Sequence, residues 1–251
     1  MLQYDIRRAF VFRYIYICPL VIAIIAWMTG LDSMLDIWNQ TSSLEAGWCI
    51  QFTMKVFEQN NIQFTLPVCA ALPFSVQFVE EWKSGMIKNA VTRTNKRDYL
   101  LSKIVTTACS GGLVLSLSVI FLFGIIAILF GGQEAQFDEF ETLRELLILY
   151  IQLVCRYFCV GALWAELGLL VSACLNHRLM AWLSPFIVYY LLIILCERYF
   201  SKCYVMYPRE WITPVMQWPL EQWGVCLWIL FLTATVSYGF YRVGERVLQN
   251  V

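Results

Sequence analysis

The sequence predicts an all-α integral membrane protein with six transmembrane helices. Hydrophobic residues make up 60% of its 251 residues and charged residues only 14%, and the mean hydropathy is +0.64, unlike a soluble domain. A bilayer core about 30 Å thick needs about 20 apolar residues per helix. Six such runs fit into the chain with short polar segments between them. We therefore treat residues 1–251 as a single transmembrane domain.

The six predicted spans are spread evenly along the chain. They cover about residues 14–30, 62–79, 104–130, 146–175, 180–196 and 223–241. Before the first span, apolar residues of the segment 2–12 recur every fourth position, with Asp5 and Arg8 off that face. This pattern predicts an amphipathic helix lying in the cytoplasmic interface. An ordinary charged flank of the first span is the alternative.

Two of the predicted spans carry residues that shape helices. The second span contains Pro67 and Pro73, and because each proline removes a backbone donor, we expect a kinked or broken helix that suits a lining role. The third span begins with small residues, including the run Ser110-Gly111-Gly112. Small residues allow helices to approach closely in lipid, so this run predicts a packing face.

The fourth apolar run is long for one crossing. If the crossing begins at Tyr157, Arg156 reaches the outer interface and Glu166 lies near the midplane. A carboxyl group at that depth costs about 2.5–3.5 kcal/mol on insertion scales, so it should face protein or water. Glu166 is therefore the best intramembrane candidate for function, and an interhelical hydrogen bond is the alternative.

The segment between the fifth and sixth spans, residues 197–222, is rich in proline and tryptophan. Amphipathic aromatic side chains prefer the headgroup level of a bilayer, and prolines interrupt helices. The segment therefore predicts short outer helices or a partly re-entrant piece.

Positive charge indicates the sidedness of this layout. The connector 80–103 holds six of the eighteen Lys and Arg residues, and other basic residues flank the first span, the turn 176–179 and the end of the last span. Basic loops remain in the cytoplasm. Both termini and the connector are therefore predicted to be cytoplasmic, and the acidic segments 32–61 and 131–145 are predicted to lie outside.

The cysteines and the lone histidine argue against a metal site. The ten cysteines are scattered without a C-x-x-C pair, and His177 is the only histidine. Only Cys49 and Cys203 fall in predicted outer segments, where a disulfide between them is possible if the compartment is oxidising. The remaining cysteines are expected to act as small buried apolar residues.

Catalytic signatures are also missing. The pair Glu80-Glu81 resembles the Glu-Glu-x-x-x-Arg element of intramembrane prenyl-protein endopeptidases, but Gly85 stands in place of the arginine and the additional histidines are absent. The chain has no Gly-Lys dipeptide and therefore no Walker phosphate-binding loop. The sequence predicts a protein that is not an enzyme and has no nucleotide site of its own.

Two stretches around the basic connector carry a family resemblance. The proline-bearing second span ends in EWKSG at residues 81–85, and RDYLLSK at residues 97–103 enters the third. Together with the six-span layout, the amphipathic start and the outer segment before the last span, they resemble the permease subunits of bacterial type 2 ABC exporters. The resemblance covers nearly the whole chain.

The resemblance implies a coupling helix within residues 80–103 that docks on a separate ATPase. The residues it implicates in coupling are Glu80, Glu81, Gly85, Arg93, Arg97 and Lys103. Glu81 and Gly85 would shape an elbow. The basic residues Arg93, Arg97 and Lys103 would contact the ATPase or lipid phosphates. For each basic residue, a role in topology alone is the alternative.

The resemblance also implies the assembly and its setting. Two permeases, identical or homologous, and two ATPases would form the exporter in the bacterial plasma membrane, with ATP and Mg²⁺ bound by the ATPases and no nucleic acid involved. The substrate path would lie between the permeases and work by alternating access. Polar side chains at membrane depth are the candidates for lining it: Gln77, Glu166, Tyr189 and Tyr190.

Two other function classes stay open. One is a membrane-embedded immunity or sensor protein that works by binding. The other is an ion-coupled secondary transporter with Glu166 as its proton site. The sequence does not name the cargo, which can be a peptide, a lipid, an antibiotic or a glycan, and export rather than import rests on the resemblance.

Overall fold

The computed structural model describes residues 2–11, 13–38, 44–134, 140–200 and 203–249. Within these residues the chain is helical, and its β-structure is limited to one isolated bridge between Leu44 and Glu134. The predicted all-α class is therefore confirmed. Parts of the predicted outer segments, residues 39–43, 135–139 and 201–202, lie outside the described residues.

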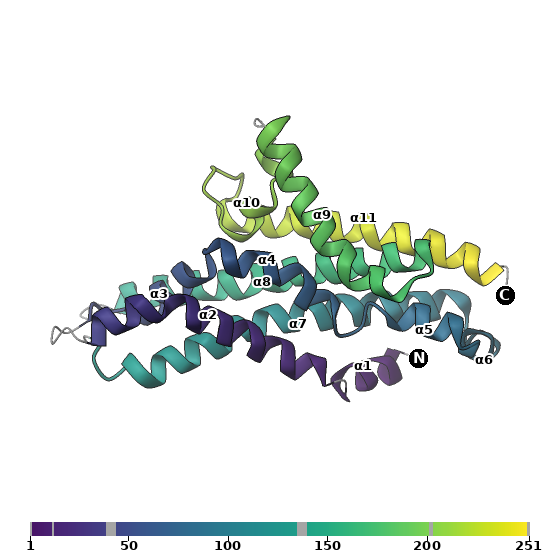
Figure 1. Ribbon diagram of the computed structural model, residues 1–251, viewed down its shortest axis with the longest axis horizontal. Coiled ribbons are helices and arrows are strands. Elements are labelled where there is room, and N and C mark those ends of the chain that lie inside the picture. The colour runs from purple at the N-terminus through teal and green to yellow at the C-terminus, as the bar shows by residue number, and fades with distance from the viewer. Residues whose placement is uncertain (1, 12, 39–43, 135–139, 201–202, 250–251) are drawn as a thin grey trace.

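The helices follow one another with short connections (Figure 1). They are α1 (Leu2–Val11), α2 (Tyr14–Trp38), α3 (Trp48–Phe57), α4 (Asn60–Ala71), α5 (Gln77–Lys83), α6 (Met86–Arg93), α7 (Lys96–Phe130), α8 (Phe140–Leu175), α9 (Arg178–Arg198), the 3₁₀ turn η1 (Tyr204–Met206), α10 (Pro208–Ile212) and α11 (Glu221–Gln249). Among the described residues, five helices are long and apolar enough to cross a membrane: α2, α7, α8, α9 and α11. This is the pattern of a multi-pass membrane protein.

The second predicted span, residues 62–79, is not one continuous helix. It is divided into α4 and α5 by a turn at residues 72–76. Pro73 lies in this turn, whereas Pro67 is tolerated inside α4. The expected break is therefore confirmed at one of the two prolines, and it leaves two helices that are each too short to cross a bilayer alone.

Helices α7 and α8 form the centre of the bundle, and every other α-helix of the described chain packs against one or both of them. Their backbones meet at Gly111 and Gly161, where a Cβ atom built on Gly111 would lie 2.6 Å from the carbonyl oxygen of Gly161. Only glycine fits so close a contact. The predicted packing face at residues 110–112 is thus confirmed.

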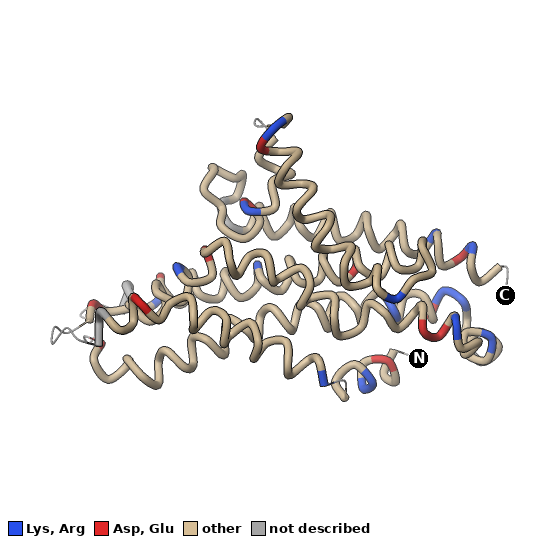
Figure 2. The backbone as a smooth tube through the Cα atoms, in the orientation of Figure 1, with Lys and Arg blue, Asp and Glu red and all other residues tan. Residues whose placement is uncertain are grey.

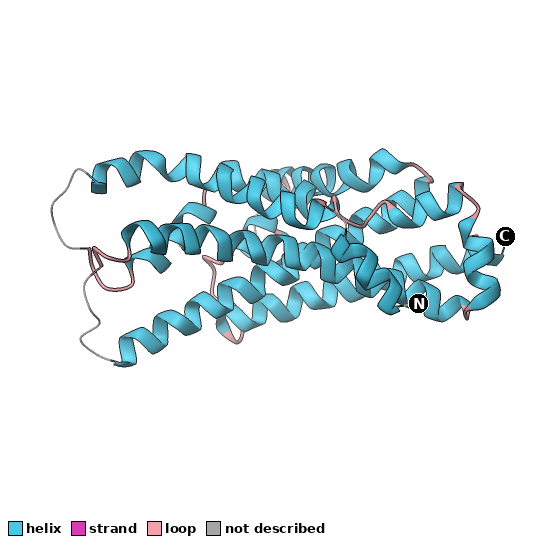
Figure 3. Ribbon diagram, turned by 90° about the horizontal axis from the view of Figure 1, so that it is seen from below, coloured by secondary structure: helices cyan, strands magenta, loops and turns pink. Residues whose placement is uncertain are grey.

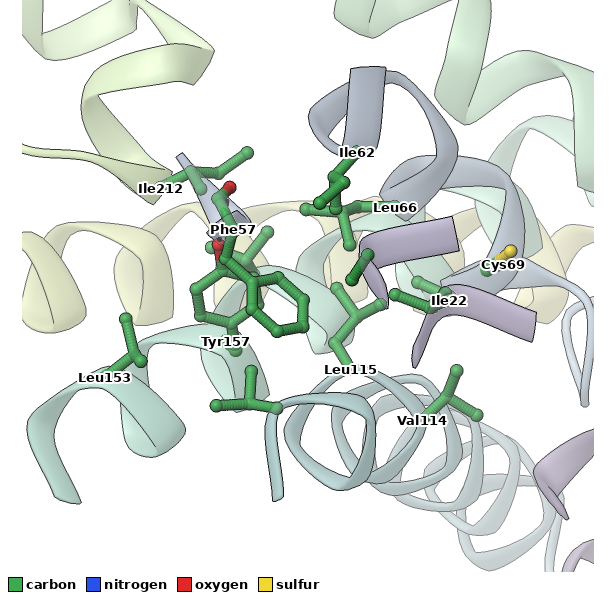
Figure 4. Close-up of a cluster of buried hydrophobic side chains, with 14 of the residues drawn as sticks. Ile22, Phe57, Ile62, Leu66, Cys69, Val114, Leu115, Leu153, Tyr157 and Ile212 are labelled. Carbon is green, nitrogen blue, oxygen red and sulfur yellow. Dashed lines mark hydrogen bonds between the residues drawn. The ribbon is translucent and has the colours of Figure 1, made fainter. Parts of the chain in front are cut away.

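The core between the helices is apolar. The rings of Phe57 and Tyr157 meet edge to face in this core, with their centroids 5.2 Å apart. Figure 4 shows them together with aliphatic side chains from α2, α4 and α7. A smaller apolar cluster at one end contains Ile87 of α6, Tyr99 of α7 and Phe240 of α11. This second cluster anchors α6 to the bundle.

The predicted cytoplasmic segments gather at one end of the bundle, and parts of two predicted outer segments, 32–61 and 131–145, meet at the other. At one end, Arg178 Nη1 lies 3.8 Å from Glu80 Oε1, and Lys96 Nζ donates a hydrogen bond of 2.9 Å to the carbonyl oxygen of Leu248. At the other end, the backbone N–H of Leu44 donates to the carbonyl oxygen of residue 133 at 3.0 Å. Figure 2 shows many of the Lys and Arg residues at the first end, and Figure 3 shows both termini there.

The segment 197–222, predicted to lie outside, forms short helices, as expected. Trp211 of α10 is buried, and its ring lies 6.0 Å from that of Trp164 in the middle of α8. Helix α9 leaves the bundle at an angle, and η1 and α10 lie beside its far end (Figure 1). The segment therefore packs into the bundle rather than covering its end.

Candidate functional site

A buried cluster of charges joins α1, α5 and α7. The side chain of Lys103, on α7, is completely buried, and its Nζ lies 3.0 Å from Asp5 Oδ1 and 2.8 Å from Glu81 Oε1. Asp5 comes from α1 and Glu81 from α5. A charge removed from water is stable only with partners, so Lys103 holds these three helices together.

The two carboxylates of the cluster have further partners. Arg8 Nη1 lies 2.9 Å from Glu81 Oε1, and the hydroxyl of Tyr99 donates to Glu81 Oε2 at 2.6 Å. The hydroxyl of Ser102 donates to Asp5 Oδ2 at 2.5 Å. The cluster thus contains two cations and two anions with their hydrogen bonds satisfied, as a stable buried network requires.

The same cluster fixes the turn between α4 and α5. The Lys103 ammonium lies 5.4 Å from the ring centroid of Phe74, which belongs to this turn. The next residue, Ser75, donates to the carbonyl oxygen of Ala165 on α8 at 3.0 Å, and Ser172 donates to the carbonyl oxygen of Ser75 at 3.3 Å. The break in the second span is therefore held by α7 and α8.

The connector forms an elbow followed by a short exposed helix. Gly85 lies between α5 and α6 with φ +72°, in the left-handed region that favours glycine. In α6, Ile87 is buried whereas Lys88 is exposed. Arg97 is exposed at the start of α7, and the side chain of Arg93 lies outside the described part of the structure.

Two coupling candidates differ from the expectation. Lys103 was expected to contact a partner or lipid phosphates, but it is fully buried and paired within the chain. Glu81 is likewise 5% exposed and belongs to the cluster rather than to the elbow. Glu80 is partly exposed and pairs with Arg178. The sequence reading also missed Asp5, whose position between apolar residues of an amphipathic helix was the available signal.

The path candidates do not come together as one site. Gln77 is buried, and its Oε1 has no hydrogen-bond partner among the described residues. Tyr189 is buried and donates to Gln63 Oε1 at 3.5 Å, whereas Tyr190 is 49% exposed on the outer surface of α9.

Glu166 is completely buried on α8. Its Oε2 accepts a hydrogen bond of 3.3 Å from Ser237 on α11, so the interhelical hydrogen bond is confirmed. Its Oε1 has no partner in the described part of the chain. Arg156 was expected at an interface but is 4% exposed, beside Tyr157, whose hydroxyl donates to the carbonyl oxygen of Phe57 at 3.3 Å.

The structure also describes the cysteines and the possible metal ligands. The disulfide considered between Cys49 and Cys203 is not formed: both thiols are free, the first buried and the second exposed. Within the described residues, no group of three or more His, Cys, Asp and Glu side chains is arranged to hold a metal ion. In comparisons with known proteins, no family model, no curated protein and no solved structure matches this chain.

Proposed function

We propose that the chain is the permease subunit of an ATP-driven exporter and that α6 receives movement from a separate ATPase. The observation that carries the proposal is the elbow at Gly85, where the chain turns from α5 into the short helix α6 while Ile87 keeps α6 anchored to the bundle. The exposed Lys88 and Arg97 give this end a basic surface. A partner with an acidic groove fits such a surface.

The buried cluster supports a route for the movement. A force on α6 reaches α5 directly, and from α5 it passes through Glu81 to Lys103 on α7 and to Asp5 on α1. Because the interior of a protein is closely packed, such a network moves as a unit rather than deforming gradually. In this mechanism, α1, α5 and the start of α7 shift together when the ATPases close.

The turn at residues 72–76 would pass this movement on to α8, because Ser75 is hydrogen-bonded to that helix. It separates α5, which moves with the coupling helix, from α4, which packs in the centre of the bundle. Alternating access needs an element with two arrangements, and substrate and nucleotide must favour different ones. The path would open between two permeases.

The test is purification of the tagged chain from its native membrane after chemical cross-linking, with an ATP hydrolysis assay. We expect an ATPase at one copy per permease, lost when Lys88 and Arg97 are both changed to Glu. Arg144, exposed near the start of α8 at the opposite end, provides the control, and Arg144→Glu should retain the ATPase. If the cross-linked wild-type chain brings no ATPase, the proposal is wrong.

A second candidate function is ion-coupled transport through Glu166. The observation that favours it is a completely buried carboxyl group, one oxygen of which has no partner among the described residues, because intramembrane carboxyl groups often serve as proton sites. Loss of transport in Glu166→Gln, together with transport that continues after ATP depletion, would establish this function. Binding without transport would favour an immunity or sensor protein.

A further inference from the structure

A cavity of about 240 Å³ lies in the outer segment, away from the charge cluster. The far end of α9, η1 and α10 line it, on the part of the molecule that stands apart from α1, α5 and α6 in Figure 1. Its lining residues are Cys196, Glu197, Phe200, Cys203, Tyr204, Tyr207, Glu210 and Met216. Nothing in the coupling mechanism uses this cavity.

The lining is aromatic and acidic. It contains the rings of Phe200, Tyr204 and Tyr207 together with two carboxylates, and no lysine or arginine is among the described residues that line it. Aromatic faces carry partial negative charge and attract cations, most strongly where water is excluded. The carboxylates add a full charge of the same sign. The wall is therefore suited to a cation that is also partly apolar.

Glu210 is the more buried of the two carboxylates in the wall. The Glu210 residue is 7% exposed. Its Oε2 accepts hydrogen bonds from the backbone N–H groups of Val215 at 3.0 Å and Met216 at 3.1 Å, whereas no described residue donates to its Oε1. Glu210 Oε1 is therefore free to meet a cation in the cavity, because the opposite charges attract.

The other walls are held in place by their own contacts. The hydroxyl of Tyr207 donates to Glu197 Oε1 at 3.0 Å, and Arg209 Nη1 lies 3.8 Å from the same oxygen. The ring of Tyr204 meets that of Trp218 edge to face at 5.4 Å. The site is thus preorganised, which lowers the cost of binding.

We propose that this cavity binds an organic ammonium group. The volume is below the roughly 300–1,000 Å³ of sites for drug-sized ligands, so it accommodates a choline-sized cation, either free or as one group of a larger molecule. Phe200, Tyr204 and Tyr207 would surround the ammonium group, and Glu210 Oε1 would face it. Binding at this site needs no ATPase, so the proposal stands apart from the transport function.

The test uses the full chain in nanodiscs of phosphatidylglycerol, whose headgroup carries no ammonium group. Choline and its neutral isostere 3,3-dimethylbutan-1-ol are titrated by calorimetry. We expect choline to bind at least about tenfold more tightly than the isostere, since only the cation interacts with the rings and carboxylates. Equal affinity of the two probes, or no binding of choline, would overturn the proposal.

Substitutions of residues in the cavity wall test whether choline binds there. Tyr204→Leu and Glu210→Gln should each weaken choline binding about tenfold, whereas Tyr204→Phe keeps the ring and should retain it. Glu58→Gln, at an exposed carboxylate on another segment, is the matched control. Unchanged thermal unfolding of each variant separates lost binding from lost folding. Choline affinity that is the same in all four variants would contradict this location.

A second arm distinguishes the source of the ammonium group. The titration is repeated in nanodiscs that contain phosphatidylcholine. Weaker apparent binding of free choline there identifies the lipid headgroup as a competing occupant of the cavity. Unchanged binding identifies a ligand from solution, and either result supports an ammonium site.

Discussion

The ammonium nitrogen of Lys103 lies 2.8 Å from Glu81 Oε1, although the two residues belong to different helices and the lysine is completely buried. Asp5 completes the pairing from α1. The contact connects α5 to the long α7 helix. The following predictions begin with this cluster.

Removing the central cation should destabilise the protein strongly. Lys103→Met leaves Asp5 and Glu81 buried with too little positive charge, and breaking a buried pair costs about 3–5 kcal/mol. The measurement is thermal unfolding in detergent. Arg97→Met, at an exposed position of the same helix, should change the unfolding temperature little. Equal effects of the two variants would contradict the buried pairing.

Substitutions of the neighbouring residues Glu80 and Glu81 should have very different effects on the free energy of unfolding. Glu81→Gln removes charge from the buried cluster and should cost about 1.5–3 kcal/mol, as hydrogen bonds to charged groups do. Glu80→Gln affects only a partly exposed pair with Arg178 and should cost about 0–1 kcal/mol. Chemical unfolding of the two variants measures both values. A larger effect at Glu80 would show that the α5 register is wrong.

The elbow should depend on glycine. Gly85 has φ +72° and no atom within 4 Å of a Cβ placed on it, so Gly85→Ala adds backbone strain without a clash. We expect a loss of about 1–2 kcal/mol in the free energy of unfolding. The matched control is Gly124→Ala, which also has open space but lies within helix α7, where alanine is the better helix former. Stabilisation by both substitutions would rule out the strained elbow.

The contact between α7 and α8 should not tolerate a methyl group. A Cβ atom at Gly161 would collide with the carbonyl oxygen of Gly111. Overpacking of this kind costs about 1–3 kcal/mol. Gly161→Ala should therefore lower the unfolding temperature, with Gly132→Ala as a control at an open position. An unchanged unfolding temperature would mean that the two helices are farther apart.

The thiol of Cys49 should react slowly with iodoacetamide, and the rate of this reaction should depend strongly on pH. Burial, with help from the neighbouring Glu134 carboxylate, raises the pKa of Cys49 to about 12. The reactive thiolate should therefore increase tenfold with each pH unit between pH 8 and about 11. The measurement is iodoacetamide labelling of the intact protein with quantification of each cysteine by mass spectrometry. The exposed Cys203 is the internal reference. A labelling rate for Cys49 that levels off near pH 9 would contradict the burial.

Local chemistry accounts for what could be predicted at the connector and the break. Pro73 ends a helix because it has no N–H to donate, and Gly85 permits a left-handed turn because it has no Cβ, so both features act within a few residues. Glu166 is a different case, because its hydrogen bond depends on Ser237 of another helix. The sequence indicated its depth, and only packing selected its partner.

The sequence by itself determined the all-α class, the apolar helices, the break near Pro73 and the grouping of basic segments, because hydropathy and backbone chemistry are local properties. The tertiary structure decided that Lys103 and Glu81 are buried partners, that Tyr189 and Tyr190 face different environments, and that the far end of α9 and the segment after it line a cavity. These features depend on helix rotation and on contacts between residues far apart in the chain. Neither is encoded in the charge or hydropathy of a single segment.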